Sequence, residues 1–171
     1  MTINSFDAIS DKNSTVLILG TMPGVASLTA EQYYGHQDNL FWDIIFRVLD
    51  ENWNSEEVVN VDYDTKKKLL LKNGVALWDV LKYCDRKGSL DTAIKNEIKN
   101  DLANFIDKHP NIKTIFFNGQ KAHKYFIELK HEIPNIDSIE QILLQSTSPS
   151  NTRNSFYILK EWTSIRKYLN N

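Results

Sequence analysis

Two segments of the sequence carry more glycine and polar side chains than a simple turn requires. The first spans residues 20–24 and leads into residues 33–42, and the second spans residues 146–151. Two of the six glycines flank Pro23 in the first segment, which lets the backbone approach a ligand closely while the turn stays stiff. The segment matches neither the dinucleotide-binding nor the phosphate-binding glycine motif. Composition alone therefore leaves a ligand-binding loop and an ordinary strand-to-loop turn equally open.

Single side chains near these segments are also open to two interpretations. Asn39 precedes an apolar helical pattern, where it could cap the helix or, as an amide that does not titrate, orient a water or a leaving group. Phe41 could stack on a flat ligand or fill the core. Asp79 follows a predicted strand, where it could accept hydrogen bonds from a ligand or cap a buried loop. The hydroxyls of residues 146–150 could bind phosphates or belong to a generic Ser/Pro turn.

The elements that must position these residues are four short apolar runs and the helical patterns between them. The predicted strands are residues 15–19, 75–78, 112–117 and 141–144, and the predicted helices are residues 40–49, 94–106, 121–129 and from Ser155 onward, with Ser155 as N-cap. The runs lack the alternation of a sheet with one wet face, so we expect strands buried on both faces. The sequence therefore predicts an α/β fold, a three-layer α/β/α sandwich around a central, mainly parallel four-stranded sheet. Both polar segments follow strands, at the edge where such sheets bind ligands.

Length and composition limit the class of protein. A chain of 171 residues, 42% of them hydrophobic, predicts one domain over residues 1–171, in which the acidic stretch 51–64 is a solvated connector. The single cysteine, Cys84, excludes an internal disulfide and a multi-cysteine metal site, and we expect neither metal nor cofactor. A formal charge of −2 argues against attachment to nucleic acid or membrane by bulk charge alone. With no signal sequence and no apolar run of about 20 residues, we expect a soluble, cytoplasmic protein.

Several motifs, in the expected order, resemble those of one family. The first motif region of the uracil-DNA glycosylase superfamily, in the form typical of its hypoxanthine-DNA (deoxyinosine) glycosylase branch, is similar to residues 20–24 (Gly-Thr-Met-Pro-Gly), 33–36 (Tyr-Tyr-Gly-His) and 39–42 (Asn-Leu-Phe-Trp). The second motif of that branch resembles residues 146–151, Ser-Thr-Ser-Pro-Ser-Asn. Between these two motifs, residues 74–79, 88–91 and 117–122 occupy positions equivalent to those of the same branch. The resemblance covers nearly the whole chain.

This resemblance implies a DNA repair enzyme. A base inside a duplex is out of reach, so such an enzyme extrudes the nucleotide into a pocket, at a cost of roughly a few kcal/mol, and hydrolyses its N-glycosidic bond. The implied substrate is a deaminated base, hypoxanthine, in double-stranded or single-stranded DNA, and the product is an abasic site. Because the two main motif regions contain no lysine, the implied enzyme is monofunctional and forms no Schiff base. We expect it to act as a monomer without a cofactor.

The resemblance also implies roles for individual residues. Asn39 is the implied catalytic residue, which places the attacking water or holds the leaving base, and Phe41 is the implied stacking ring. The implied base-binding residues are Thr21, Met22, Pro23, Gly24, Phe41 and Asp79. The implied DNA-contact residues are His36, Ser146, Thr147, Ser148, Pro149, Ser150 and Asn151.

Two positions depart from the family pattern. Met22 stands where uracil-excising and mismatch-specific relatives have Asp or Asn, and a thioether can neither activate nor position water. The sequence therefore favours hypoxanthine over uracil. Gln37 stands where the branch has proline, which loosens the loop more than it alters its chemistry. The rival functions are uracil or broader deaminated-base specificity, a non-catalytic DNA- or nucleotide-binding relative, and a small α/β enzyme that acts on free nucleotides.

Overall fold

Four parallel strands form the central sheet of the computed structural model, which describes residues 2–50, 53 and 61–169. The strands are β3 (Val75–Asp79), β2 (Val16–Gly20), β6 (Thr114–Asn118) and β7 (Glu140–Leu144), in that order across the sheet. Every residue of β2 and β6 is buried. These two strands lie inside the sheet, and their apolar composition suits a strand that is covered on both faces.

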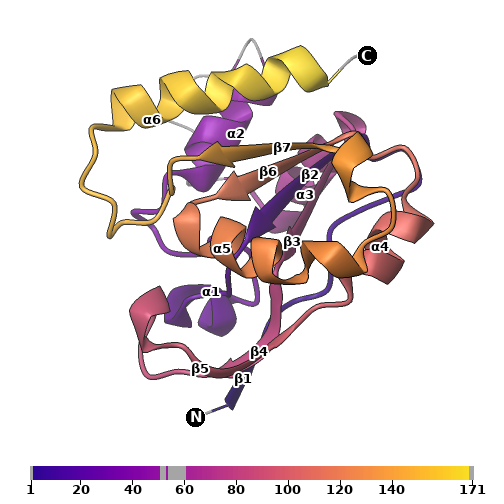
Figure 1. Ribbon diagram of the computed structural model, residues 1–171. Coiled ribbons are helices and arrows are strands. Elements are labelled where there is room, and N and C mark those ends of the chain that lie inside the picture. The colour runs from indigo at the N-terminus through magenta and orange to yellow at the C-terminus, as the bar shows by residue number, and fades with distance from the viewer. Residues whose placement is uncertain (1, 51–52, 54–60, 170–171) are drawn as a thin grey trace.

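Helices cover both faces of this sheet (Figure 1). The α-helices are α1 (Val25–Ala30), α2 (Phe41–Leu49), α3 (Tyr63–Lys72), α4 (Leu102–Lys108), α5 (Gln120–Leu129) and α6 (Ser155–Trp162), and the short 3-10 helices are Asp91–Ala93, Lys130–Glu132, Ile136–Ser138 and Thr163–Tyr168. Val16 and Ile18 of β2 pack with α2, α3 and α6, whereas Leu17 and Leu19 pack with α4 and α5. The predicted three-layer sandwich is confirmed. Within the described residues, no helix is both long and apolar enough to cross a membrane.

A second, antiparallel sheet lies beside the first and was not predicted. It consists of β1 (Thr2–Asn4), β4 (Leu81–Asp85) and β5 (Lys95–Lys99), in that order. The helix predicted over residues 94–106 is therefore wrong in its first half, where the chain pairs with β4 instead. Asn100 separates the two elements, because its Nδ2 donates to the backbone oxygens of Asp79 and Leu81 at 2.8 and 3.1 Å. The Asp101 side chain then caps α4.

Two further boundaries differ from the prediction. Asn154, not Ser155, caps α6, since its Oδ1 accepts a hydrogen bond from the backbone N–H of Phe156 at 2.8 Å. The acidic connector predicted over residues 51–64 runs into α3, which is capped by Asp62; residues 51–52 and 54–60 of that prediction lie outside the described residues. No helix was predicted over α3, because its sequence is rich in lysine and has a weak apolar pattern; Leu70 is the fully buried residue of this helix.

Candidate active site

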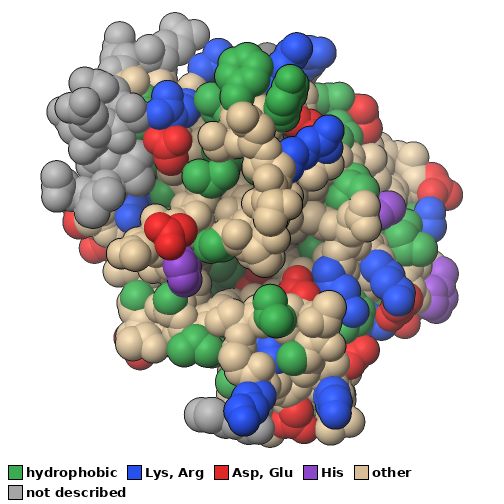
Figure 2. Space-filling view, turned by 90° about the vertical axis from the view of Figure 1, so that its left-hand side faces the viewer, with side chains coloured by type: hydrophobic (Ala, Val, Ile, Leu, Met, Phe, Trp, Pro, Cys, Tyr) green, Lys and Arg blue, Asp and Glu red, His purple; other side chains and the backbone are tan. Residues whose placement is uncertain are grey.

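The carboxyl ends of the parallel strands surround a cavity of about 360 Å³, a volume usual for small-molecule sites. It lies next to β2 and β6, where the order of the strands reverses and where open parallel sheets bind their ligands. Figure 2 looks onto this edge of the molecule and shows the hollow. The predicted residues that line the cavity are Thr21, Met22, Pro23, Gly24, His36, Asn39, Asp79, Ser146, Thr147, Ser148, Pro149 and Ser150. Phe41 and Asn151 do not line it.

Two tyrosines, Tyr33 and Tyr34, line the cavity, and Tyr34 is the one that stacks on Phe41. Phe41 is fully buried, and its ring stacks on the ring of Tyr34 with centroids 3.9 Å apart and planes inclined by 22°. Tyr34 itself lines the cavity, so it separates Phe41 from any ligand there. Phe41 also packs edge to face against Trp162, with ring centroids 5.8 Å apart. Phe41 is therefore held in place and supports the Tyr34 ring on the side away from the cavity. Phe41 lies in the core and does not line the cavity, so the ring of this pair that faces the cavity is Tyr34.

A close approach over Gly20 shapes the inner part of the cavity. Gly20 and Asp79 are partners in the register of β2 and β3. A Cβ atom at Gly20 would lie 2.5 Å from Asp79 Oδ1 and 2.7 Å from the hydroxyl oxygen of Tyr34. Real Cβ atoms do not come this close to other atoms, so only glycine allows the carboxyl group and the phenol to converge here.

Asp79 is almost completely buried, with 3% of its surface exposed. Its Oδ2 accepts a hydrogen bond from the Ser5 hydroxyl at 2.7 Å, and its Oδ1 lies over Gly20. Burial raises the pKa of the Asp79 carboxyl group to about 7, although the Ser5 hydrogen bond and the charge of Arg86 act in the opposite direction. The carboxyl group therefore changes its protonation near neutral pH. Burial also raises the pKa of Tyr34, so the phenol remains a hydrogen-bond donor.

Asn39 serves both the helix and the cavity. Its Oδ1 accepts a hydrogen bond from the N–H of Phe41 at 3.0 Å, at the first turn of α2. A backbone N–H requires the oxygen end of the amide at this place, which fixes the orientation of the side chain. The nitrogen end, Nδ2, has no partner among the described residues, and the side chain lines the cavity. The two interpretations of Asn39 are therefore compatible, and the end that remains for a ligand is a donor.

Asn118, at the end of β6, is a cavity residue that the sequence prediction missed. Its Nδ2 donates to Thr147 Oγ1 at 2.9 Å, and its Oδ1 accepts from the N–H of Thr147 at 2.9 Å. Both residues are buried, so water cannot replace these bonds. The signal was present in the sequence, because Asn118 follows an apolar run at the same edge of the sheet as Asp79.

The loop of residues 146–151 is held more tightly than expected. Thr147 is 0% exposed and bonds Asn118, so its side chain fixes the loop. Asn151 closes the loop, because its Nδ2 donates to the backbone oxygen of Ser146 at 2.8 Å. Pro149 and Ser150 are exposed at the rim of the cavity. On the other side of the mouth, His36 is half exposed and accepts a hydrogen bond from the N–H of Asp38 at 3.1 Å.

The hairpin between β4 and β5 supplies a further wall that the sequence did not predict. Ser89, Leu90 and Asp91 line the cavity. The fully buried Arg86 side chain donates from Nη2 to the backbone oxygen of Pro23 and lies 3.7 Å from the Asp91 carboxylate. The hairpin therefore holds the loop of residues 20–24 in place. The contact between Arg86 and Pro23 joins residues far apart in the sequence, and no apolar pattern predicts it.

This arrangement defines a class of protein: a parallel α/β sheet with a cavity at its carboxyl edge, tyrosine rings in the lining of that cavity and a serine-rich rim. Within the described part of the chain, no group of three or more His, Cys, Asp or Glu side chains is placed to hold a metal ion. The sequence matches the uracil DNA glycosylase superfamily over residues 6–167. The protein belongs to this superfamily.

Two similar proteins from the genus Methanosarcina have the same name. The hypoxanthine DNA glycosylase of Methanosarcina barkeri is 34% identical over 148 residues, which cover 86% of this chain and 87% of the relative. That of Methanosarcina acetivorans is 34% identical over 163 residues, with 95% and 97% covered. The solution NMR structure of a Methanosarcina acetivorans protein described as a uracil DNA glycosylase matches the fold with a TM-score of 0.82, at 33% identity and over 100% of both chains.

Replacing Asn118 with alanine should lower the free energy of unfolding by about 1–3 kcal/mol, because two buried groups of Thr147 lose their partners. Urea unfolding measures this change. Thr147→Val is the matched variant, since it removes the hydroxyl but keeps the N–H that Asn118 Oδ1 accepts. Since the two side chains share one interaction, the double variant should lose less stability than the sum of the single variants. Strict additivity would contradict the pairing.

Proposed function

We propose that the protein is a monofunctional DNA glycosylase that hydrolyses the N-glycosidic bond of a flipped deaminated base, hypoxanthine, and leaves an abasic site. One observation carries the proposal: the cavity of this superfamily member combines an aromatic wall, Tyr34, with the donor end of Asn39 and the carboxyl group of Asp79. The two Methanosarcina relatives, both named hypoxanthine DNA glycosylase, support the choice of base.

Tyr34 is the surface on which an extruded base would stack. A purine ring has two flat faces, and an aromatic side chain recovers part of the stacking that the base loses when it leaves the duplex. The tyrosine ring is supported by Phe41 at 3.9 Å, so it does not have to be ordered when the base arrives. Met22, which is buried and also lines the cavity, adds apolar contact but no hydrogen bond.

Asp79 suits the edge of hypoxanthine better than that of adenine. Hypoxanthine carries a hydrogen on N1, which a carboxylate oxygen can accept, whereas adenine presents a lone pair at N1 and would repel it. Asp79 Oδ1 lies over Gly20, while Oδ2 is engaged by Ser5. The oxygen that remains for the base is therefore Oδ1, and an undamaged adenine would place the lone pair of its N1 against this oxygen, with no hydrogen to donate.

Asn39 acts on the departing base. As the bond to the sugar breaks, negative charge grows on the purine, and a donor that is already fixed in place stabilises that charge. Because Asn39 Oδ1 is already engaged by the N–H of Phe41, the side chain offers only Nδ2. This favours a hydrogen bond to the leaving base over the orientation of water by the amide oxygen.

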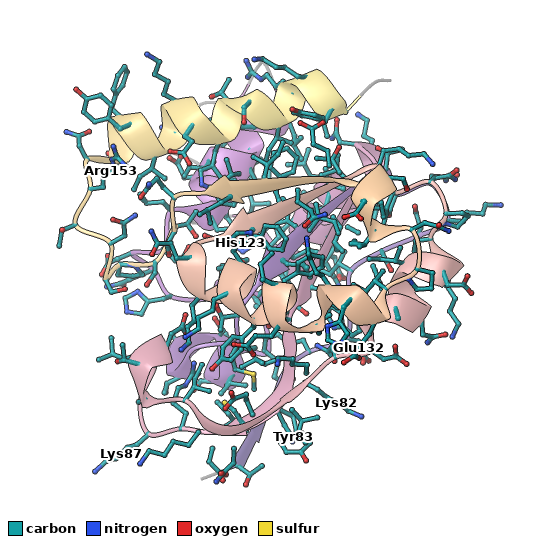
Figure 3. All side chains as sticks on the ribbon, in the orientation of Figure 1. Lys82, Tyr83, Lys87, His123, Glu132 and Arg153 are labelled. Atoms are coloured by element: carbon teal, nitrogen blue, oxygen red, sulfur yellow. The ribbon has the colours of Figure 1, made fainter. Side chains whose placement is uncertain are left out.

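The DNA is held through hydroxyls and a few cations. Ser150 and His36 lie at the rim of the cavity, and such groups can bind phosphates without strong net charge. Lys87 on the β4–β5 hairpin and Arg153 before α6 lie on opposite sides of the edge that carries the cavity (Figure 3). No lysine lines the described cavity wall, which fits hydrolysis by water. We propose that the protein acts as a monomer on double-stranded DNA, and on single strands as well.

A panel of duplexes tests the proposal. Each duplex carries one deoxyinosine, deoxyuridine or deoxyxanthosine, and abasic sites are cleaved with alkali after incubation with the protein. We expect cleavage at deoxyinosine. Product at deoxyuridine alone would favour the uracil-specific alternative, and no product from any duplex would rule out the glycosylase function.

Replacing Asn39 with alanine should lower the single-turnover excision rate about 100- to 1,000-fold, because one preorganised donor to the leaving group is lost. The affinity for the duplex, measured by fluorescence anisotropy, should change by less than about threefold, since phosphate contacts dominate it. Asp38→Ala, at the exposed neighbouring position, is the control and should keep the wild-type rate. Wild-type turnover by a folded Asn39→Ala variant would remove Asn39 from the mechanism.

Excision of hypoxanthine should increase with pH across neutrality. The pKa of Asp79 is raised to about 7, and only the ionised carboxylate, whose fraction grows as the pH rises through that value, accepts the N1 hydrogen. Single-turnover rates between about pH 6 and 8 should rise to a plateau in the wild type and stay level in Asp79→Asn. Asp43→Asn removes a carboxylate that pairs with Arg47 on α2 and should retain the wild-type profile. The same rise in Asp79→Asn would exclude Asp79 as its source.

A further inference from the structure

Asp79 is a buried carboxyl group without an ion pair of its own. It is 3% exposed, its Oδ2 accepts a hydrogen bond from the Ser5 hydroxyl, and among the described residues it forms no ion pair. The charge of Arg86 acts on Asp79, but that buried guanidinium donates to the backbone oxygen of Pro23 and lies 3.7 Å from the Asp91 carboxylate. Because a buried charge without a partner is costly, a cationic ligand in the cavity would stabilise the ionised form of Asp79.

The lining of the cavity combines carboxyl groups with aromatic rings. Asp79 and Asp91 both line it, as do Tyr33 and Tyr34. Among the described lining residues there is no lysine or arginine, and the one side chain that can acquire a positive charge is His36, at the mouth. Burial raises the pKa of both carboxyl groups, because burial penalises the charged form. The lining therefore favours a ligand that carries positive charge itself.

The Tyr34 ring offers a face on which a flat cation can stack. The faces of aromatic rings carry negative potential and attract cations within about 6 Å of the ring centroid. One face of Tyr34 is covered by Phe41, with ring centroids 3.9 Å apart, so the other face is left for a ligand. The Tyr34 hydroxyl oxygen and Asp79 Oδ1 both lie over Gly20. A flat cation stacked on the ring would therefore have the carboxylate at its edge.

Purines alkylated at a ring nitrogen are flat cations of this kind. Guanine methylated at N7 keeps the N1–H and the C6 oxygen that hypoxanthine presents, and the methyl group adds a positive charge that is spread over the ring. This charge makes the N1–H a stronger donor toward Asp79 and attracts the base to the Tyr34 ring. It also weakens the bond to the sugar, because the base departs as a neutral molecule.

We propose that the same cavity accepts a second class of substrate, guanine alkylated at N7, and excises it from DNA; this rests on the proposed DNA glycosylase function. The bond between N9 and C1′ breaks with both electrons going to the base, which cancels the positive charge of the ring. Water adds to C1′ and releases one proton to the solvent, so the products are a neutral alkylated guanine and an abasic site. Since no negative charge develops on this base, its departure does not depend on the donor of Asn39.

The test compares three duplexes that differ at one nucleotide. The first carries N7-methylated deoxyguanosine, the second carries 7-methyl-7-deazadeoxyguanosine, which has the same shape and N1–H without the charge, and the third carries deoxyinosine. Base release is measured by chromatography and corrected for release without protein, and affinity is measured by fluorescence anisotropy. We expect release of 7-methylguanine and hypoxanthine, and binding of the charged duplex about threefold or more tighter than that of its uncharged counterpart.

Two variants separate the reactions. Asn39→Ala should lower the release of hypoxanthine about 100- to 1,000-fold but that of 7-methylguanine less than about tenfold, because only the first base leaves with negative charge. Asp79→Asn should lower the release of 7-methylguanine about tenfold or more and abolish the preference for the charged duplex, because an amide carries no charge. Asp43→Asn, which removes a carboxylate that pairs with Arg47 on α2, is the control and should change neither quantity.

Each contrary result has a distinct meaning. Release of hypoxanthine without release of 7-methylguanine above the background would overturn the second activity and leave the proposed function intact. Equal affinity for the charged and uncharged duplexes, or a preference that persists in Asp79→Asn, would overturn recognition of the cation by the carboxylate. An equal loss of both activities in Asn39→Ala would overturn the neutral departure of the alkylated base. A wild-type protein that releases no base from any duplex would overturn the proposed function itself.

Discussion

Asn118 ties the loop that follows the last strand to the end of the strand beside it, and the geometry of the cavity depends on that contact. The two ends of its buried side-chain amide each form a hydrogen bond with Thr147 at 2.9 Å. The register of the sheet makes this possible, because Asn118 pairs with Leu144 just before the loop, and Gly20 pairs with Asp79. The neighbouring parallel strands end at the same edge of the sheet, so Asp79 and Asn118 at their carboxyl ends lie in one row. The loops that form the cavity surround this row.

The row combines groups whose protonation and orientation are set by burial. Asp79 is held by Ser5 and buried beside Gly20, so its carboxyl group has a pKa of about 7. Asn39 presents a donor because its oxygen is used by the helix. The Asp79 carboxylate can accept the N1–H of hypoxanthine, and the Asn39 amide can donate to the negative charge that develops on the departing base. Together the two side chains are complementary to a deaminated purine as it leaves. Away from bulk solvent, such fixed groups act more strongly than in water.

The sequence was informative where periodicity and strand ends determine the structure. Four apolar runs predict the central sheet, and the polar residues that follow them, such as Thr21 and Asp79, line the cavity. It was uninformative where contacts are non-local. Residues 95–99 carry a helical spacing but pair with β4, and Arg86 reaches Pro23 across the fold. The sequence pointed to Phe41 and not to Tyr34, because which of two stacked rings faces the cavity depends on packing.

In the proposed complex, the cavity binds an extruded hypoxanthine between Tyr34 and Asp79. A crystal structure of the Asn39→Ala variant with a duplex that contains one deoxyinosine tests it most directly. We predict that the base lies in the cavity with its ring on Tyr34 and its N1 within hydrogen-bonding distance of Asp79 Oδ1. A hypoxanthine that remains stacked in the duplex, or that binds away from Tyr34 and Asp79, would contradict this account.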